Sequence, residues 1–146
     1  MNIQQIADRF AIKHLVDTFS NLADEKRVAE QTALFTETAS VNTYINGELA
    51  FAMQGREQIG QVFTDYLANF DTVYHLNGQQ ILEFIDEQTA DGITYCQVAL
   101  TFTKDGKSMM LSHYVRYDDR YCKVGGEWLI AERVAKFLIS EERVMG

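Results

Sequence analysis

The stretch Asp71-Thr-Val-Tyr-His-Leu-Asn-Gly-Gln-Gln-Ile-Leu-Glu-Phe84 marks the point where helical sequence gives way to β-rich sequence. Its β-branched, aromatic and other apolar residues predict a strand that is mostly buried. The stretch also contains His75. An imidazole has an unperturbed pKa of about 6.5, so a half-buried histidine is a candidate general base near neutral pH. The alternative interpretation of His75 is a histidine that only hydrogen-bonds to the backbone.

The sequence before this stretch predicts three helices. Apolar residues recur at helical spacing over residues 2–23 and widen to more than one stripe, which predicts a first helix covered on most of its surface. A second helix is predicted from Val28 to Phe35. A third is predicted from Arg56 to Asn69, with its apolar face packed inward.

Turn signals divide the remaining sequence into strands. Asn46-Gly47 supplies the positive φ values of a type I′ turn and predicts a hairpin of residues 39–45 and 49–53. Four long strands are predicted over Thr72–Ile85, Ile93–Thr103, Ser108–Tyr121 and Glu127–Ile139, separated by Asp91-Gly92, Asp105-Gly106 and Gly125-Gly126. Helices followed by a meander predict an α+β fold in one domain, residues 1–146. We expect a conical half-barrel in which a curved, mostly antiparallel sheet wraps around the N-terminal helices and encloses a pocket.

Composition narrows the class of protein. With 47% hydrophobic and 23% charged residues the chain is typical of a globular domain. A net charge of -8 opposes a phosphate backbone, so we expect no nucleic-acid partner. Charges run through residues 1–20 and no window approaches about 18 apolar residues, so we expect no signal peptide, no membrane span and a cytoplasmic location. Cys96 and Cys122 lack metal-binding spacing, which predicts reduced core thiols and neither a metal site of the zinc type nor a disulfide scaffold.

Side-chain alternation along the last two strands places two polar groups in apolar rows. Arg133 shares its row with Leu129, Ala131, Ala135, Phe137 and Ile139. A buried arginine needs a partner, and an ion pair with a nearby carboxylate is its alternative role. His113 shares its row with Met109, Leu111, Val115 and Tyr117, so we expect it to point inward as well. Its alternative role is a core histidine that donates to a carbonyl.

The opposite row of the last strand predicts an apolar outer surface. It comprises Trp128, Ile130 and Val134, joined by Tyr114 and Met110. Such a patch calls for a partner, and a homodimer through this sheet face is the simplest one.

Asp24, which follows the first helix, has a structural alternative too, because aspartate is a favoured N-cap worth about 1 kcal/mol.

Four segments resemble the SnoaL-like branch of the nuclear transport factor 2-like superfamily, and in particular the subgroup that is similar to scytalone dehydratase and hexachlorocyclohexane dehydrochlorinase. They are Leu22-Ala-Asp-Glu-Lys-Arg27, Gly55-Arg-Glu57, Thr72-Val-Tyr-His75 and Gly126-Glu-Trp-Leu-Ile-Ala-Glu-Arg133. The resemblance implies a catalytic dyad of Asp24 and His75, with Arg133 in the pocket. The sequence differs from these relatives at three positions. Phe19 stands where the dehydrochlorinase has a lysine, and Ala23 stands where scytalone dehydratase has a tyrosine. Ala99 or Leu100 stands where scytalone dehydratase has its second histidine.

The resemblance implies a cofactor-free general-base enzyme, a lyase or isomerase of the dehydratase-like type, acting on a small hydrophobic molecule that could be cyclic. Tyr44, Tyr66 and His113 are the expected ligand-binding residues, whereas Tyr74 has the wrong parity to share the face of His75. Two alternatives stay open. One is a non-catalytic small-ligand-binding domain of the same fold. The other is an assembly subunit, as in the β subunits of ring-hydroxylating dioxygenases.

Overall fold

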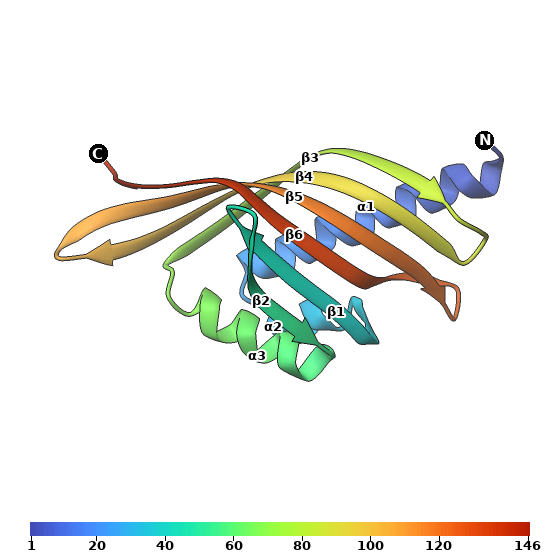
Figure 1. The fold of residues 1–146 in the computed structure, drawn as a ribbon, viewed down its shortest axis with the longest axis horizontal. Helices are drawn as coiled ribbons and strands as arrows, with labels where there is room; N and C mark the ends of the chain where they lie inside the picture. Colours follow the sequence, from blue (N-terminus) through green and yellow to red (C-terminus); the bar gives the residue numbers. More distant parts are fainter.

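The computed structural model describes residues 1–146 and contains three helices and six strands. In chain order they are α1 (Ile3–Asp24), α2 (Val28–Thr32), β1 (Phe35–Ile45), β2 (Glu48–Gln54), α3 (Arg56–Leu67), β3 (Thr72–Phe84), β4 (Thr89–Lys104), β5 (Lys107–Val124) and β6 (Glu127–Val144). The strands form one curved, unclosed sheet in the order β2-β1-β6-β5-β4-β3 (Figure 1). Its pairs are antiparallel except β1 with β6, which is parallel.

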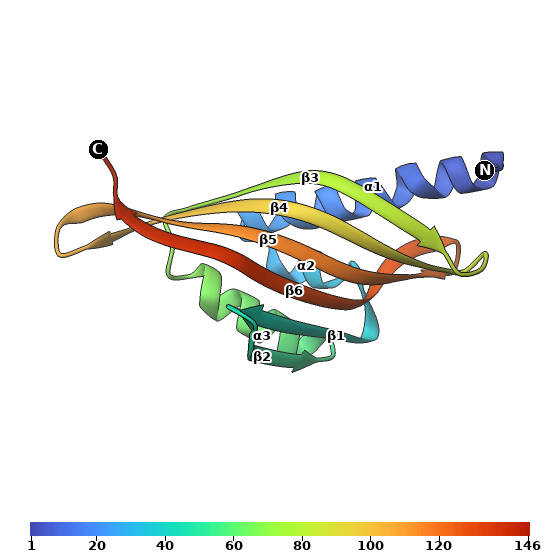
Figure 2. The same ribbon diagram turned by 45° about the horizontal axis from the view of Figure 1, so that its top comes forward.

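The helices lie together on one side of the curved sheet (Figures 1 and 2). α1 packs along β3, and α3 packs beneath the β1–β2 hairpin. The architecture is therefore the predicted α+β half-barrel, with the N-terminal helices inside the curvature of a mostly antiparallel sheet. No helix of the chain is both long enough and apolar enough to cross a membrane.

Three of the four predicted glycine turns are confirmed. Asn46 and Gly47 both have positive φ, 52° and 81°, and residues 105–106 and 125–126 also form turns between consecutive strands. The prediction for Asp91-Gly92 is wrong, because these residues lie inside β4 and the chain turns at residues 85–88. A Cβ on Gly92 would lie 2.7 Å from Leu82 Cδ2 and 2.8 Å from Tyr121 Cε2. Gly92 thus permits close packing within the sheet instead of a turn.

Two helix predictions need correction. The second helix ends at Thr32, and Phe35 begins β1, where it is fully buried with its ring 5.3 Å from that of Phe19. Tertiary packing has overridden the weak local preference for helix. The first helix is less covered over its first turns than predicted: Ile3, Ile6 and Phe10 are 86%, 45% and 75% exposed. Periodicity identified the apolar stripe but not how far the sheet covers it.

A β-bulge in β6 overturns the predicted outer patch. Arg120 pairs with Glu132 and Tyr121 with Ile130, so Ala131 is an extra residue that reverses the alternation of side chains. Trp128 and Ile130 are consequently 6% and 0% exposed, and they point to the same interior as Arg133. The prediction that these two residues form part of an outer surface for a homodimer is therefore wrong.

A second bulge lies in β3. Asn77 pairs with Cys96 and Gln80 with Thr94, so two residues of β3 face one of β4. His75 and Asn77 lie before the bulge with their side chains partly buried, whereas Gln79, which strict alternation would place on the same face, is exposed. Beyond it, the inward positions are even-numbered and Leu82 is buried.

The interior consists of two apolar clusters. The larger includes Ile12, Phe19 and Ile130, and the smaller includes Val98 and Leu100. Both cysteines are free thiols, Cys96 buried and Cys122 half-buried. Burial raises the pKa of the Cys96 thiol to about 11.

Candidate active site

A cavity of about 120 Å³ lies between the two apolar clusters and is lined by 16 residues, 11 of them hydrophobic. Side chains from all three helices and from β1, β3, β4, β5 and β6 contribute to it. The five polar members are Gln31, Thr43, His75, His113 and Arg133. The cavity is therefore an apolar chamber with a few polar groups, which is the usual character of a small-molecule site.

A second hollow of about 460 Å³, between α3 and the β1–β2 hairpin, adjoins this chamber. The two share Thr43, Phe63, Tyr66, His113 and Phe137. Its other lining residues include Phe51, Met53 and Val62. The hollow beneath the hairpin and the cavity are therefore direct neighbours.

Asp24 and His75 form a close pair at the end of α1 and the start of β3. Asp24 Oδ1 lies 2.7 Å from His75 Nδ1, and Asp24 Oδ2 accepts a hydrogen bond of 3.2 Å from the His75 backbone N–H. A carboxylate only accepts, so Nδ1 carries the proton and Nε2 of the neutral ring has the free lone pair. The interpretation of Asp24 as an N-cap is wrong, because α2 begins at Val28 with Arg27 as its N-cap.

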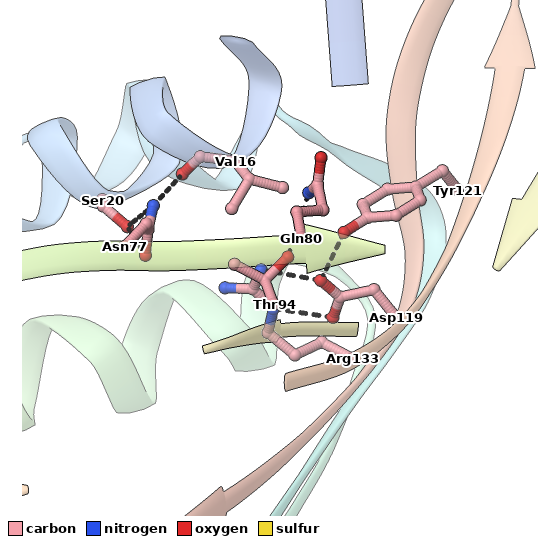
Figure 3. Close-up of polar contacts among 8 residues, drawn as sticks. All are labelled: Val16, Ser20, Asn77, Gln80, Thr94, Asp119, Tyr121 and Arg133. Atoms are coloured by element: carbon pink, nitrogen blue, oxygen red, sulfur yellow. Dashed lines mark hydrogen bonds and ion pairs between the residues drawn. The ribbon is translucent and has the colours of Figure 1, made fainter. Parts of the chain in front are cut away.

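A network around Asn77 holds β3 against α1 (Figure 3). Asn77 Nδ2 donates to Val16 O at 3.3 Å, Ser20 Oγ at 3.1 Å and Asp17 Oδ1 at 3.0 Å. Asn77 is two residues from His75 on the same strand. The network therefore fixes the strand that carries the histidine relative to the helix that carries Asp24.

Arg133 is 2% exposed and makes a bidentate ion pair with Asp119, with Nε and Nη2 each 2.9 Å from a carboxylate oxygen (Figure 3). Tyr121 Oη donates to the same carboxylate at 2.7 Å. Burial acts to lower the pKa of Arg133, but attraction to Asp119 outweighs it and the pKa is raised. The guanidinium carbon also lies 3.8 Å from the ring centroid of Tyr117 and 4.7 Å from that of Phe19.

The structure therefore contains the ion pair that was the alternative role of Arg133. Arg133 lines the cavity as well. Its third nitrogen, Nη1, is buried and has no hydrogen-bond partner in the chain. The same side chain therefore braces two strands and presents one free donor to the site.

His113 also faces the cavity and is 7% exposed. Its Nδ1 lies 2.7 Å from Ser140 Oγ, so the predicted alternative of a bond to a carbonyl is wrong. Burial, and then the charge that His75 can carry, lower the pKa of His113. The ring is therefore neutral at pH 7, and its Nε2 is buried without a partner.

The structure separates the predicted tyrosines. Tyr66 lines the cavity, and burial raises its pKa, so its hydroxyl stays protonated. Tyr44 lines a different surface hollow with Asn46 and Lys136 and does not join the other site residues. Tyr74 is 55% exposed, in agreement with its parity.

Two side chains of the candidate site were not predicted from the sequence. Asp119, the partner of Arg133, continues the inward row of His113 and Tyr117, and extending that alternation would have found it. Gln31 lies on α2, is 2% exposed and lines the cavity. A polar residue in a five-residue helix has no pattern to identify it. No group of three or more His, Cys, Asp or Glu side chains is arranged to hold a metal ion.

Comparisons with known structures agree with this architecture. A proposed scytalone dehydratase from Novosphingobium aromaticivorans DSM 12444 superposes with a TM-score of 0.85 at 21% identity, covering 100% of this chain and 94% of that one. A type 2 hexachlorocyclohexane dehydrochlorinase gives 0.81 at 15% identity, with coverage of 100% and 94%. The β subunit of a proposed aromatic-ring-hydroxylating dioxygenase from N. aromaticivorans gives 0.76 at 16% identity, with coverage of 93% and 92%.

Sequence comparison finds a relative and a family. The uncharacterized protein Rv2910c of Mycobacterium tuberculosis (strain ATCC 25618 / H37Rv) is 26% identical over 135 residues, which are 92% of this chain and 88% of that protein. The model of the SnoaL-like domain matches residues 4–134. The chain, with its half-barrel fold, belongs to the SnoaL-like family.

Proposed function

We propose that this protein is a cofactor-free general-base enzyme, a lyase or isomerase of the dehydratase-like type, that removes a proton from a carbon atom of a small hydrophobic molecule. The observation that carries the proposal is the contact between Asp24 and His75 at the wall of a small apolar cavity. A histidine oriented by a carboxylate, next to a chamber that excludes bulk water, is a common arrangement for proton abstraction.

In the proposed reaction, His75 Nε2 takes a proton from a substrate carbon, and Asp24 stabilises the imidazolium that forms. The electron pair left on carbon then either expels a leaving group from the neighbouring carbon or forms an enolate. In an isomerisation, His75 returns the proton to a different carbon. Arg133 Nη1 stabilises the negative charge on the leaving group or on the enolate oxygen. His113 contacts the bound molecule from β5, and Tyr66 contacts it from α3.

The size of the cavity limits the substrate. Its volume, about 120 Å³, is somewhat below the 150 Å³ or so of an engineered protein cavity that holds benzene. A single ring or a short chain is therefore the part of the substrate that reacts. Larger substituents would extend into the hollow beneath the β1–β2 hairpin. The fold shared with scytalone dehydratase-like and dehydrochlorinase structures supports the choice of an elimination or isomerisation reaction.

Deuterium exchange tests the proposal without knowledge of the natural substrate. The full-length protein is incubated in D2O with small cyclic ketones, and loss of the proton signal α to the carbonyl is followed by NMR. We expect exchange above the buffer rate, and we expect His75→Ala to abolish it. The matched control is His14→Ala, since His14 is exposed on α1 and its ring makes a hydrogen bond only to Thr18. Exchange that is equal in the wild type and in His75→Ala would reject the enzymatic proposal.

Non-catalytic binding of a small ligand is the second candidate, because Asp24 also accepts a hydrogen bond from the backbone of β3 and so could serve as a brace. In that case His75→Ala would lower stability and leave exchange unaffected. An assembly subunit would not need the chamber.

We further propose a cytoplasmic homo-oligomer with no nucleic-acid partner, based on the net charge of -8 and on the exposed apolar stripe of α1.

A further inference from the structure

Three buried side-chain atoms in the chain lack a hydrogen-bond partner: Gln31 Oε1, His113 Nε2 and Arg133 Nη1. All three residues line the same cavity, and they are 2%, 7% and 2% exposed. No other fully buried side-chain nitrogen or oxygen lacks a partner. Leaving a buried polar atom unpaired is costly, so such atoms are few in native proteins. Their restriction to one apolar chamber indicates that they serve a ligand and not the fold.

The chemistry of each atom defines what it must meet. Arg133 Nη1 can only donate, because a guanidinium has no acceptor atom. Nε and Nη2 already bind Asp119, so Nη1 is the nitrogen that still requires an acceptor. Gln31 Oε1 can only accept and requires a donor. In the neutral ring, His113 Nε2 accepts when Nδ1 donates to Ser140 Oγ, and it donates when Nδ1 accepts from that hydroxyl. The remaining wall, from Phe19, Val98 and Leu100 among others, is apolar.

We propose that this cavity binds an oxygenated ring, with one hydroxyl group that donates to Gln31 Oε1 and a second oxygen that accepts from Arg133 Nη1. A halogenated or plain hydrocarbon has no donor for Gln31 and would leave its oxygen unpaired. Gln31 is thereby the residue that determines specificity. The inference rests on the proposed function for the identity of the site, but it requires binding alone and not proton transfer by His75.

Gln31 offers a sharp variant because its side-chain oxygen makes no hydrogen bond within the protein. Gln31→Leu keeps the approximate volume and removes the unpaired atom, so the variant should be as stable as the wild type or more stable. The matched control is Thr32→Val on the same helix. Thr32 is buried and does not line the cavity, and its hydroxyl donates to Ala29 O at 3.2 Å.

The test compares resorcinol with two rings of similar size that lack a donor, 1,3-dichlorobenzene and m-xylene. Affinities for the full-length protein are measured by NMR from the ring-proton shifts of His75 and His113. We expect resorcinol to bind more tightly than the other two. In Gln31→Leu, the ratio of resorcinol to dichlorobenzene affinity should fall about tenfold, the effect of one hydrogen bond, whereas Thr32→Val should leave the ratio unchanged.

Equal or tighter binding of dichlorobenzene or m-xylene by the wild type would overturn the proposal. So would an absence of resorcinol binding at the two histidines, or a ratio that Gln31→Leu leaves unchanged. The outcome is separable from the catalytic proposal. Preference for resorcinol without deuterium exchange on ketones would reject the catalytic proposal and support the ligand class. Deuterium exchange without that preference would reject the ligand class and support the catalytic proposal.

Discussion

The carboxylate of Asp24 contacts His75 twice, at the ring through Oδ1 and at the backbone N–H through Oδ2. One side chain thus sets both the tautomer of the imidazole and the position of the strand that carries it. Asp24 ends α1 and His75 lies near the start of β3, so these two contacts join residues that are 51 positions apart in sequence.

Asp24→Asn should therefore separate catalysis from structure. The amide keeps an oxygen for the backbone N–H of His75, but it is neutral and cannot stabilise the imidazolium. We expect the deuterium exchange rate to fall by roughly 100-fold or more, with little change in the urea midpoint. Glu25→Gln, at the next and exposed position, is the control and should retain the wild-type rate. An unchanged rate in Asp24→Asn would mean that the carboxylate only braces the strand.

The Arg133–Asp119 pair should be costly to break singly. Asp119→Leu leaves a buried guanidinium without its counter-ion and should lower the free energy of unfolding by roughly 3–5 kcal/mol. Replacing both partners, as in Asp119→Leu with Arg133→Met, should recover much of that loss because no charge remains buried. Urea denaturation of the two variants measures the difference. If the double variant is no more stable than the single one, the ion pair is not the source of the loss.

His113 should make stability depend on pH. Its pKa is lowered in the folded state by burial and then by His75, so the unfolded chain binds a proton more readily. Stability should consequently be highest above the unfolded pKa of about 6.5 and should decrease as the pH falls below it, toward the folded pKa. Urea midpoints at pH 7.5 and 5.5 should differ less in His113→Gln than in the wild type. A wild-type difference equal to that of the variant would contradict the prediction.

The same coupling can be observed directly. Removing the positive charge that His75 can carry should raise the pKa of His113, because His75 is the second cause of the lowered value. An NMR titration of the His113 ring in His75→Ala measures this shift. His14→Ala, which removes the exposed histidine of α1, should leave the titration of His113 as it is in the wild type.

Gly92 and Gly78 provide a matched pair within the sheet. A methyl group on Gly92 would lie within 3 Å of Leu82 and Tyr121, whereas one on Gly78 would meet Tyr95 at 3.7 Å, an ordinary contact. Gly92→Ala should cost about 1–3 kcal/mol of unfolding free energy through overpacking. Gly78→Ala should change it far less, and chemical denaturation of both variants is the measurement. Equal losses would indicate a backbone effect common to both glycines.

The apolar stripe of α1 bears on the oligomeric state. Ile3, Ile6 and Phe10 lie on one side of the helix at spacings of three and four and are exposed. If this stripe forms the subunit contact, the wild type should elute as an oligomer at micromolar concentration and Phe10→Ser should shift it toward monomer. A monomeric wild type in size-exclusion chromatography would reject the proposed homo-oligomer.

Local sequence determined the kind and order of the elements. The helical spacing before Asp71, the β-rich runs after it and the turn at Asn46-Gly47 all depend on neighbours within a few residues, and the structure confirms them. Resemblance to known sequences supplied the pairing of Asp24 with His75, which no local pattern contains. The structure then placed the two side chains in contact.

Only the tertiary structure decided which side chains share the interior. The bulges near Gly78 and at Ala131 each reverse the alternation of a strand, so parity counted from sequence is correct on one side of a bulge and wrong on the other. The parallel pairing of β1 with β6, the ion pair of Asp119 with Arg133 and the entry of Gln31 into the cavity depend in the same way on contacts between distant segments. Strand register and the packing between elements depend on residues that are far apart in the sequence. The periodicity of apolar residues within one segment therefore cannot predict them.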